Sequence, residues 1–272
     1  MEIRFSPLFS GSSGNSTYVG CDDAHILVDA GVSGTRVSQE LARVGIDPNA
    51  LNAILVTHEH ADHIKGIGIL SRKYDLPVYA TEGTWEGMYD KIGAIADKNR
   101  VIFEPDQDFF IGSLDITPFS IPHDAAQPVG YTFELDGSKF SIATDIGSVR
   151  DGWMGHVIGS DAIILESNYD LDMLKAGRYP YDLKKRIMSR KGHLSNDDAG
   201  YVAVELAKNG TQQIILGHLS KENNFPELAM RSCELAFQMA GLVPHEDAML
   251  YVAHRDGTTG MFSISSRLAS YT

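Results

Sequence analysis

The stretch THEHADH at residues 57–63 places three histidines and one aspartate within six residues, directly after the apolar run AILV at 53–56. A short apolar run of this kind predicts a buried strand that ends where the histidines begin. Neutral imidazole and carboxylate groups together suit Zn²⁺, Mn²⁺ or Fe²⁺. In an extended loop, His58 and His60 can face one position while Asp62 and His63 face a second one. The stretch therefore predicts a centre that holds two divalent metal ions.

Two metal ions need more ligands than this stretch supplies, and three later residues stand where ligands are expected. His123 follows the predicted strand that ends in IP, Asp145 follows SIAT, and His218 follows IIL. A single polar residue at a strand end is more often satisfied by its neighbours than bound to a metal. Together with the histidine cluster, however, all three are predicted ligands.

Short β-type runs alternate with helical patterns along the whole chain, without a repeat, a low-complexity tract or a linker. This organisation predicts one α/β domain over residues 1–272. Strands are expected at 2–9, 16–20, 25–29, 53–57, 77–80, 101–103, 108–122, 129–135, 138–144, 161–166 and 213–216, and helices at 35–44, 64–73, 196–208 and 225–240.

Two of the predicted helices begin with capping patterns. Ser195 is followed by Asp198, and Asn224 is followed by Glu227, so each side chain is expected to accept a hydrogen bond from a free backbone N–H. The first pattern places His193 in a loop that leads into a helix, and such loops often carry functional residues.

Composition describes an ordinary globular chain of 272 residues, with 43% hydrophobic and 22% charged residues. Two cysteines, Cys21 and Cys233, favour a reducing compartment and no disulfide scaffold. The early polar Ser-Gly run is not typical of a signal peptide, and no run of 18 apolar residues occurs. We therefore expect a cytoplasmic protein without a membrane partner.

The net charge of −13 is unevenly distributed. Residues 171–195 carry seven basic and two acidic side chains, a local charge of +5. Such a run is either a solvated helix face or a contact for an acidic partner such as nucleic acid. Sequence alone leaves both interpretations open.

The order of strand, THxHxDH, later His, later Asp and later His resembles the metallo-β-lactamase fold hydrolases. This resemblance implies a four-layer αββα sandwich, in which two mixed β-sheets are flanked by helices. It also implies that Asp29 supports the ligands, although Asp29 could equally be a turn residue before Gly31. The implied ligands are His58, His60 and His123 for one metal, Asp62, His63 and His218 for the other, and Asp145 as the bridge.

Members of this fold hydrolyse β-lactams, thioesters or phosphodiesters, so the fold alone does not give the substrate. The later metal position is filled by Asp145 rather than by cysteine, which is associated with the thioesterase and phosphodiesterase branches. The motifs around Glu166 and His193 resemble nuclease and tRNA-processing members, in which an additional Glu and His assist the leaving group. The basic segment before His193 also favours a nucleic-acid substrate.

The opening SGSSGNS, with GHLSN at 192–196 and GHLSKENN at 217–224, is most similar to the YycJ/WalJ/VicX branch of bacterial proteins. This resemblance implies a dinuclear phosphodiesterase, a 5′-to-3′ exonuclease on DNA with a role in repair. We predict that Asp62 orients or deprotonates the attacking water and that His193, held by Glu166, protonates the leaving oxygen. The predicted substrate contacts are Ser12, Ser13, Ser195, Ser220, Asn223, Lys184, Lys185 and Arg186.

Three alternatives remain. One is a small-molecule ester or thioester hydrolase of the glyoxalase II type, and another is an RNA-processing nuclease. DNA is favoured over RNA because Asp145 and His218 are only 73 residues apart, which leaves no room for a large inserted domain. The third is a non-catalytic regulator, which the complete ligand set disfavours.

Overall fold

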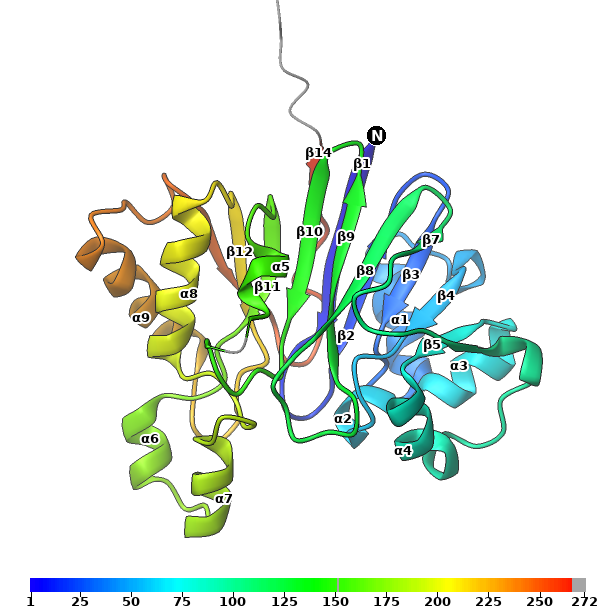
Figure 1. The fold of residues 1–272 in the computed structure, drawn as a ribbon, viewed down its shortest axis with the longest axis horizontal. Helices are drawn as coiled ribbons and strands as arrows, with labels where there is room; N and C mark the ends of the chain where they lie inside the picture. Colours follow the sequence, from blue (N-terminus) through cyan, green and yellow to red (C-terminus); the bar gives the residue numbers. More distant parts are fainter. Residues whose placement is uncertain (151, 266–272) are drawn as a thin grey trace, which may run out of the picture.

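Two β-sheets lie face to face in the computed structural model, which describes residues 1–150 and 152–265 (Figure 1). Each sheet has seven strands within these residues and combines parallel with antiparallel pairs. Helices cover the outer faces of both sheets. This arrangement confirms the predicted sandwich of two mixed sheets flanked by helices.

The first sheet contains the N-terminal strands and one strand from the end of the described chain. Its antiparallel part joins β14 to β1, β2 and β3, and its parallel part runs from β3 to β6. In order across the sheet, the strands are β14 (Phe262–Ser265), β1 (Glu2–Phe9), β2 (Ser16–Gly20), β3 (His25–Val28), β4 (Ala53–Leu55), β5 (Val78–Ala80) and β6 (Arg100–Ile102).

The second sheet has the same mixed character. Strands β10 to β13 are parallel, and β7 to β10 are antiparallel. In order across the sheet, the strands are β13 (Met249–Val252), β12 (Gln213–Gly217), β11 (Ala162–Glu166), β10 (Ser138–Ala143), β9 (Val129–Leu135), β8 (Leu114–Ser120) and β7 (Phe109–Ile111).

Alternating side chains build three separate hydrophobic cores. In β3, Ile26 and Val28 enter the core between the sheets, while Leu27 faces the helices outside. In β11, Ile164 enters the central core and Ile163 faces the outer helices. Strands buried on both faces need apolar residues on both, which explains their continuous apolar runs.

The helices divide between the two outer faces and one projecting pair. Side chains of α1 (Gly34–Arg43), α3 (Ile67–Tyr74) and α4 (Glu82–Ile92) pack on the first sheet. Side chains of α5 (Met154–Val157), α8 (Asn196–Lys208) and α9 (Pro226–Met239) pack on the second. The short helix α2 (Ala61–Ile64) lies at the lower edge in Figure 1, where α6 (Leu171–Ala176) and α7 (Tyr181–Ile187) also project. Two 3₁₀ turns, Pro48–Ala50 and Asp97–Asn99, precede β4 and β6.

Some predicted elements were wrong in detail. The expected strand 108–122 is a hairpin of β7 and β8, because the chain turns at Gly112 with a φ of 57°. The expected helix 64–73 is two helices, and Gly66 between them donates its N–H to Ala30 O at 2.7 Å. Strands β13 and β14 were not predicted.

Only one of the two predicted caps forms. Ser195 makes a reciprocal capping box with Asp198 at the start of α8. Helix α9 instead begins after Phe225 without a side-chain cap. The Asn224 amide nitrogen donates to Ser167 O, and its oxygen accepts from Asn196 and from the N–H of Phe225. Asn224 therefore joins two loops rather than capping a helix.

Candidate metal centre and active site

The predicted ligands come after strand ends: most lie in loops, whereas Asp62 and His63 lie in the short helix α2. Asp29 follows β3, His58 comes three residues after β4, and Asp145 and His218 follow β10 and β12. Loops at the carboxyl ends of parallel strands meet at one edge of a sheet, which is where α/β folds place their sites. Because the two sheets face each other, residues from both reach the same centre.

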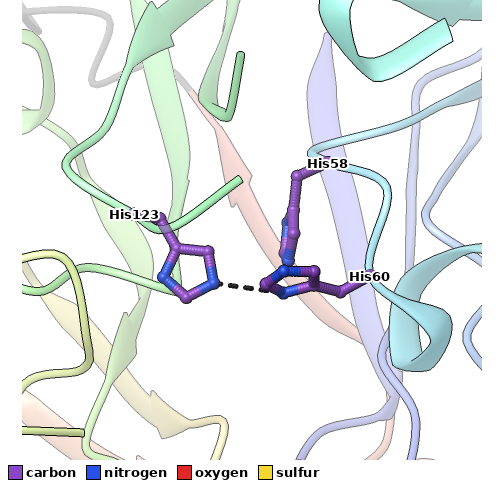
Figure 2. A group of neighbouring side chains, drawn as sticks. All are labelled: His58, His60 and His123. Atoms are coloured by element: carbon purple, nitrogen blue, oxygen red, sulfur yellow. Dashed lines mark hydrogen bonds between the residues drawn. The ribbon is translucent and has the colours of Figure 1, made fainter. Parts of the chain in front are cut away.

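His58, His60 and His123 form the first group, and Figure 2 shows their rings turned toward one another. One nitrogen from each lies within 4.8 Å of the others. His60 Nδ1 and His123 Nε2 are 3.3 Å apart. Three imidazoles at this spacing are suited to one divalent ion.

Asp62, His63 and His218 form the second group, again with one potential ligand atom each within 4.8 Å. Asp145 stands between the groups: its Oδ2 lies 3.3 Å from His63 Nε2, and its Oδ1 lies 3.7 Å from His123 Nε2. A carboxylate in this position can reach both groups. The structure thus brings together the residues of both ligand sets that the resemblance implies.

Three buried polar atoms at this centre have no hydrogen-bond partner within the described residues. They are His58 Nε2, His218 Nε2 and Asp145 Oδ2. A buried polar atom without a partner lowers the stability of the folded protein. A bound cation would accept a lone pair from each of these three atoms. The donor set present therefore fits divalent metal ions.

The opposite ring nitrogens are fixed by hydrogen bonds. His63 Nδ1 lies 2.8 Å from Asp29 Oδ2, and His123 Nδ1 lies 3.1 Å from Gly192 O. His218 Nδ1 lies 2.8 Å from Glu166 Oε1. Partners of this kind hold a ligating histidine in one tautomer and orientation. Asp29 therefore holds a predicted ligand in place.

The backbone is strained where it enters the centre. Asp29, Asp145 and His218 have φ values of 59°, 60° and 55°, in the left-handed region that residues with a side chain seldom adopt. Each follows a strand end, so the strain turns the side chain into the site. Gly31 permits a close approach nearby, because a Cβ there would meet Asp62 O at 1.6 Å.

Burial and charge set the protonation of the histidines. Burial and the neighbouring imidazoles lower the pKa of His58, which keeps this ring neutral. Burial also lowers the pKa of His63, but the carboxylates of Asp145, Asp29 and Asp62 outweigh it and raise that pKa to about 9. The centre is therefore rich in negative charge that attracts cations.

Glu166 and His193 lie beside the metal-ligand groups. His193 Nδ1 is 2.8 Å from Glu166 Oε1, and the His193 side chain is 19% exposed. Burial raises the pKa of Glu166, but the adjacent His193 and His218 imidazoles lower it below its usual value. Glu166 is therefore an ionised carboxylate that holds both rings. A further group of potential metal ligands, with one atom from each residue within 4.8 Å of the others, contains His193, Asp145, Glu166 and His218.

The predicted serine and asparagine contacts fall into two classes. Ser12 and Ser13 are exposed at the tip of the Gly11–Gly14 loop. Ser195 is buried, and its hydroxyl donates to Asp198 Oδ2 at 2.7 Å. The hydroxyl of Ser220 accepts from the backbone N–H of Asn223, and both residues are buried. Ser12 and Ser13 are thus accessible to a substrate, whereas the other three stabilise loops.

The basic residues of α7 also differ from one another. Lys184 Nζ donates to Lys175 O and Gly177 O, both at 2.7 Å, so it fastens α7 to the end of α6. Arg186 pairs with Asp124, the residue after His123. Lys185 is exposed. Only part of the predicted basic surface is therefore free to meet an acidic ligand.

Sequence reasoning missed several residues that support the centre. Thr57 donates its hydroxyl to Asp29 Oδ2 at 2.8 Å, and Asn15 Nδ2 lies 3.0 Å from His63 Nε2. Asn168 Nδ2 donates to His218 O at 2.8 Å. Asn15 lies in the SGSSGNS stretch and Thr57 in THEHADH, so these motifs could have indicated both residues. Asn168 acts through a contact 50 residues away along the chain.

A search of the described residues for membrane-spanning helices finds none of sufficient length and apolar character.

Comparison with known proteins gives consistent results. A β-lactamase superfamily domain matches residues 24–219. The exodeoxyribonuclease YycJ of Bacillus anthracis is 43% identical over 241 residues, which cover 89% of this chain and 91% of YycJ. The exodeoxyribonuclease WalJ of Streptococcus pneumoniae is 40% identical over 264 residues, covering 96% of this chain and 98% of WalJ.

Solved structures show the same fold at low sequence identity. The metallo-β-lactamase fold protein YhfI from Bacillus subtilis superposes with a TM-score of 0.73 at 18% identity, covering 97% of this chain and 100% of YhfI. Zn²⁺-bound PqqB from Methylobacterium extorquens gives a TM-score of 0.70 at 20% identity, with 98% and 100% coverage.

The domain match, together with the candidate ligands for divalent metals, identifies a metal-dependent hydrolase. The chain belongs to the β-lactamase superfamily and, within it, to the family that includes YycJ and WalJ.

Proposed function

We propose that this chain is an exodeoxyribonuclease that hydrolyses phosphodiester bonds of DNA with two divalent metal ions. The observation that carries the proposal is the convergence of the three unpartnered atoms, His58 Nε2, His218 Nε2 and Asp145 Oδ2, on one charged centre. The similarity to the exodeoxyribonucleases YycJ and WalJ, at 43% and 40% identity, supports DNA as the substrate.

His58, His60 and His123 would hold one ion, Asp62, His63 and His218 the other, and Asp145 would contact both. When bound, the two ions would acidify a water molecule and offset the charge that develops on the phosphoryl oxygens. Zn²⁺, Mn²⁺ and Fe²⁺ all suit this mixture of imidazole and carboxylate. The proposed number of ions is two because each group supplies three ligand atoms.

Asp62 orients the attacking water in this mechanism. Its side chain is 26% exposed, and its Oδ2 lies 3.7 Å from both His63 Nε2 and His218 Nε2. One carboxylate oxygen can therefore face the histidines while the other accepts a hydrogen bond from the water. This hydrogen bond directs a lone pair of the water toward phosphorus.

His193 donates the proton that the departing oxygen requires. Nδ1 donates a hydrogen bond to Glu166, which orients the ring and leaves Nε2 to act as the donor. The partly exposed position of the ring lets a substrate reach Nε2. His193 is thus the proton donor, and Glu166 is the carboxylate that orients it.

The Ser12–Ser13 loop and Lys185 are the proposed contacts for substrate phosphates. Both lie in exposed segments, and backbone N–H groups in such a loop can bind an anion. The resemblance to the YycJ/WalJ branch supports 5′-to-3′ polarity, a role in DNA repair, a cytoplasmic location and a single domain over residues 1–272. Each of these features is part of the proposed function.

The test is hydrolysis of end-labelled single- and double-stranded DNA by purified protein loaded separately with Mn²⁺ or Zn²⁺. RNA of the same sequence and a panel of thioesters, including glutathione conjugates, serve as the competing substrates. We expect mononucleotides to be released from the 5′ end of DNA and the reaction to stop in EDTA. Faster hydrolysis of RNA or of a thioester would overturn the proposal.

A further inference from the structure

Helix α7 has a face that internal packing does not explain. None of its seven residues is buried. Tyr181, its first residue, is 78% exposed, and its side chain makes no hydrogen bond or ring contact with any described residue. Lys185 lies four residues later, on the same side of the helix. The aromatic ring and the lysine side chain therefore project from the same face of α7.

The carboxyl end of α7 is attached to the candidate active site. The His193 N–H donates to Ile187 O at 3.0 Å, and Arg186 pairs with Asp124 beside His123. Gly192 allows this close contact, because a Cβ there would meet Ile187 O at 2.1 Å. The helix thus begins at Tyr181 and ends against the proposed proton donor.

Helix α7 is also attached near its centre, at Lys184. The two hydrogen bonds from Lys184 Nζ hold it against Lys175 O and Gly177 O. Tyr181 lies five residues before Arg186, or about 8 Å along a helix that rises ~1.5 Å per residue. This distance corresponds to about two nucleotides at ~3.4 Å each along a stacked strand.

We propose that Tyr181 is a stacking platform for an unpaired base of the DNA substrate, with Lys185 contacting the adjacent phosphate. The inference rests on the proposed function and adds a preference for a single-stranded end. Aromatic rings bind unpaired bases by stacking, and neighbouring cations bind the backbone. The platform stands in the +5 segment of a chain with a net charge of −13, which favours a polyanion at this place.

The experiment measures binding of single-stranded DNA to the Mn²⁺-loaded protein by fluorescence anisotropy. Phosphorothioate linkages in the oligonucleotide prevent its hydrolysis. Tyr181→Ala should weaken binding about 5- to 150-fold, which is the usual range for losing one stacked base. Tyr181→Phe should bind like the parent. Tyr201→Ala is the matched control, because Tyr201 is 55% exposed on α8, and it should also bind like the parent.

A set of oligonucleotides with one abasic site at successive positions separates stacking from a structural effect. One position should weaken binding to the parent protein but have no additional effect on Tyr181→Ala. Equal binding by Tyr181→Ala and the parent would overturn the inference, as would the same abasic profile in both. If the parent protein neither binds nor hydrolyses DNA, the proposed function is wrong. The inference about Tyr181 is then wrong as well, because it depends on that function.

Discussion

Replacing His193 by alanine tests the proposed chemistry most directly. The change removes one hydrogen bond to Glu166, which keeps those from Ile146 N, Leu194 N and His218. We therefore expect a loss of about 1.5–3 kcal/mol in the free energy of unfolding, the usual range for a hydrogen bond to a charged group. Hydrolysis of DNA should slow by about 10²–10⁴-fold, because a general acid contributes that much.

The leaving group decides whether this loss comes from proton donation. An alkoxide departing from DNA needs a proton, whereas p-nitrophenolate departing from bis(p-nitrophenyl) phosphate does not. His193→Ala should therefore retain most of the parent rate on the aryl substrate. Single-turnover cleavage of end-labelled DNA and release of p-nitrophenolate measure the two rates, and elemental analysis measures the metal content, which we expect to stay at two ions.

His156→Ala provides the control for a lost imidazole. His156 stacks on Phe119 at 5.1 Å, and its side chain is 38% exposed. Its loss should leave both hydrolysis rates near those of the parent. Equal losses on both substrates in His193→Ala would assign His193 to positioning. Loss of metal from that variant would place it among the ligands, as the grouping with Asp145, Glu166 and His218 permits.

Three further predictions follow from the described contacts. Asp145→Ala should lose most of both metal ions, because the carboxylate lies between the two ligand groups, and elemental analysis that still finds two ions would contradict this role. Lys185→Glu should weaken DNA binding and reduce the slope of log K against log salt by about 0.7–0.9 for the lost phosphate contact, whereas Lys184→Glu should first lower the melting temperature, since Lys184 fastens α7 to α6. If Lys185→Glu has the same salt slope as the parent protein, α7 is a solvated surface that does not contact DNA. Cys21 and Cys233 are 0% and 1% exposed, and burial raises the pKa of Cys233 to about 12, so a thiol reagent at pH 8 should titrate neither cysteine until guanidinium unfolds the chain. Rapid labelling of the native protein would contradict that burial.

Local sequence was sufficient for much of the fold. The apolar runs at 53–56, 162–165 and 214–216 predict strands because both faces of each are buried. Ser195 with Asp198 predicts the start of α8 because the cap is a contact within four residues. The hairpin at Gly112 and the break at Gly66 were missed. The break at Gly66 depends on its hydrogen bond to Ala30 O, 36 residues earlier, and a local sequence pattern does not predict such a contact.

The candidate ligands could be predicted because THEHADH is dense and the later His and Asp residues stand at strand ends. Their grouping could not be derived from spacing alone and came from resemblance. In the structure, two facing sheets bring loops from β4, β8, β10 and β12 to one edge, and the positive φ of Asp145 and His218 turns them inward. Such convergence depends on contacts between residues far apart in the chain.

The amino-acid sequence specifies the types of side chain available for chemistry and the strand ends that carry them. How each side chain is used depends on the packing of the folded chain. Lys184, Lys185 and Arg186 are consecutive basic residues, yet one fastens a helix, one is exposed and one pairs with Asp124. The physical reason is that charge and hydrogen-bonding capacity belong to the residue, whereas the partner that satisfies them is set by packing between distant segments.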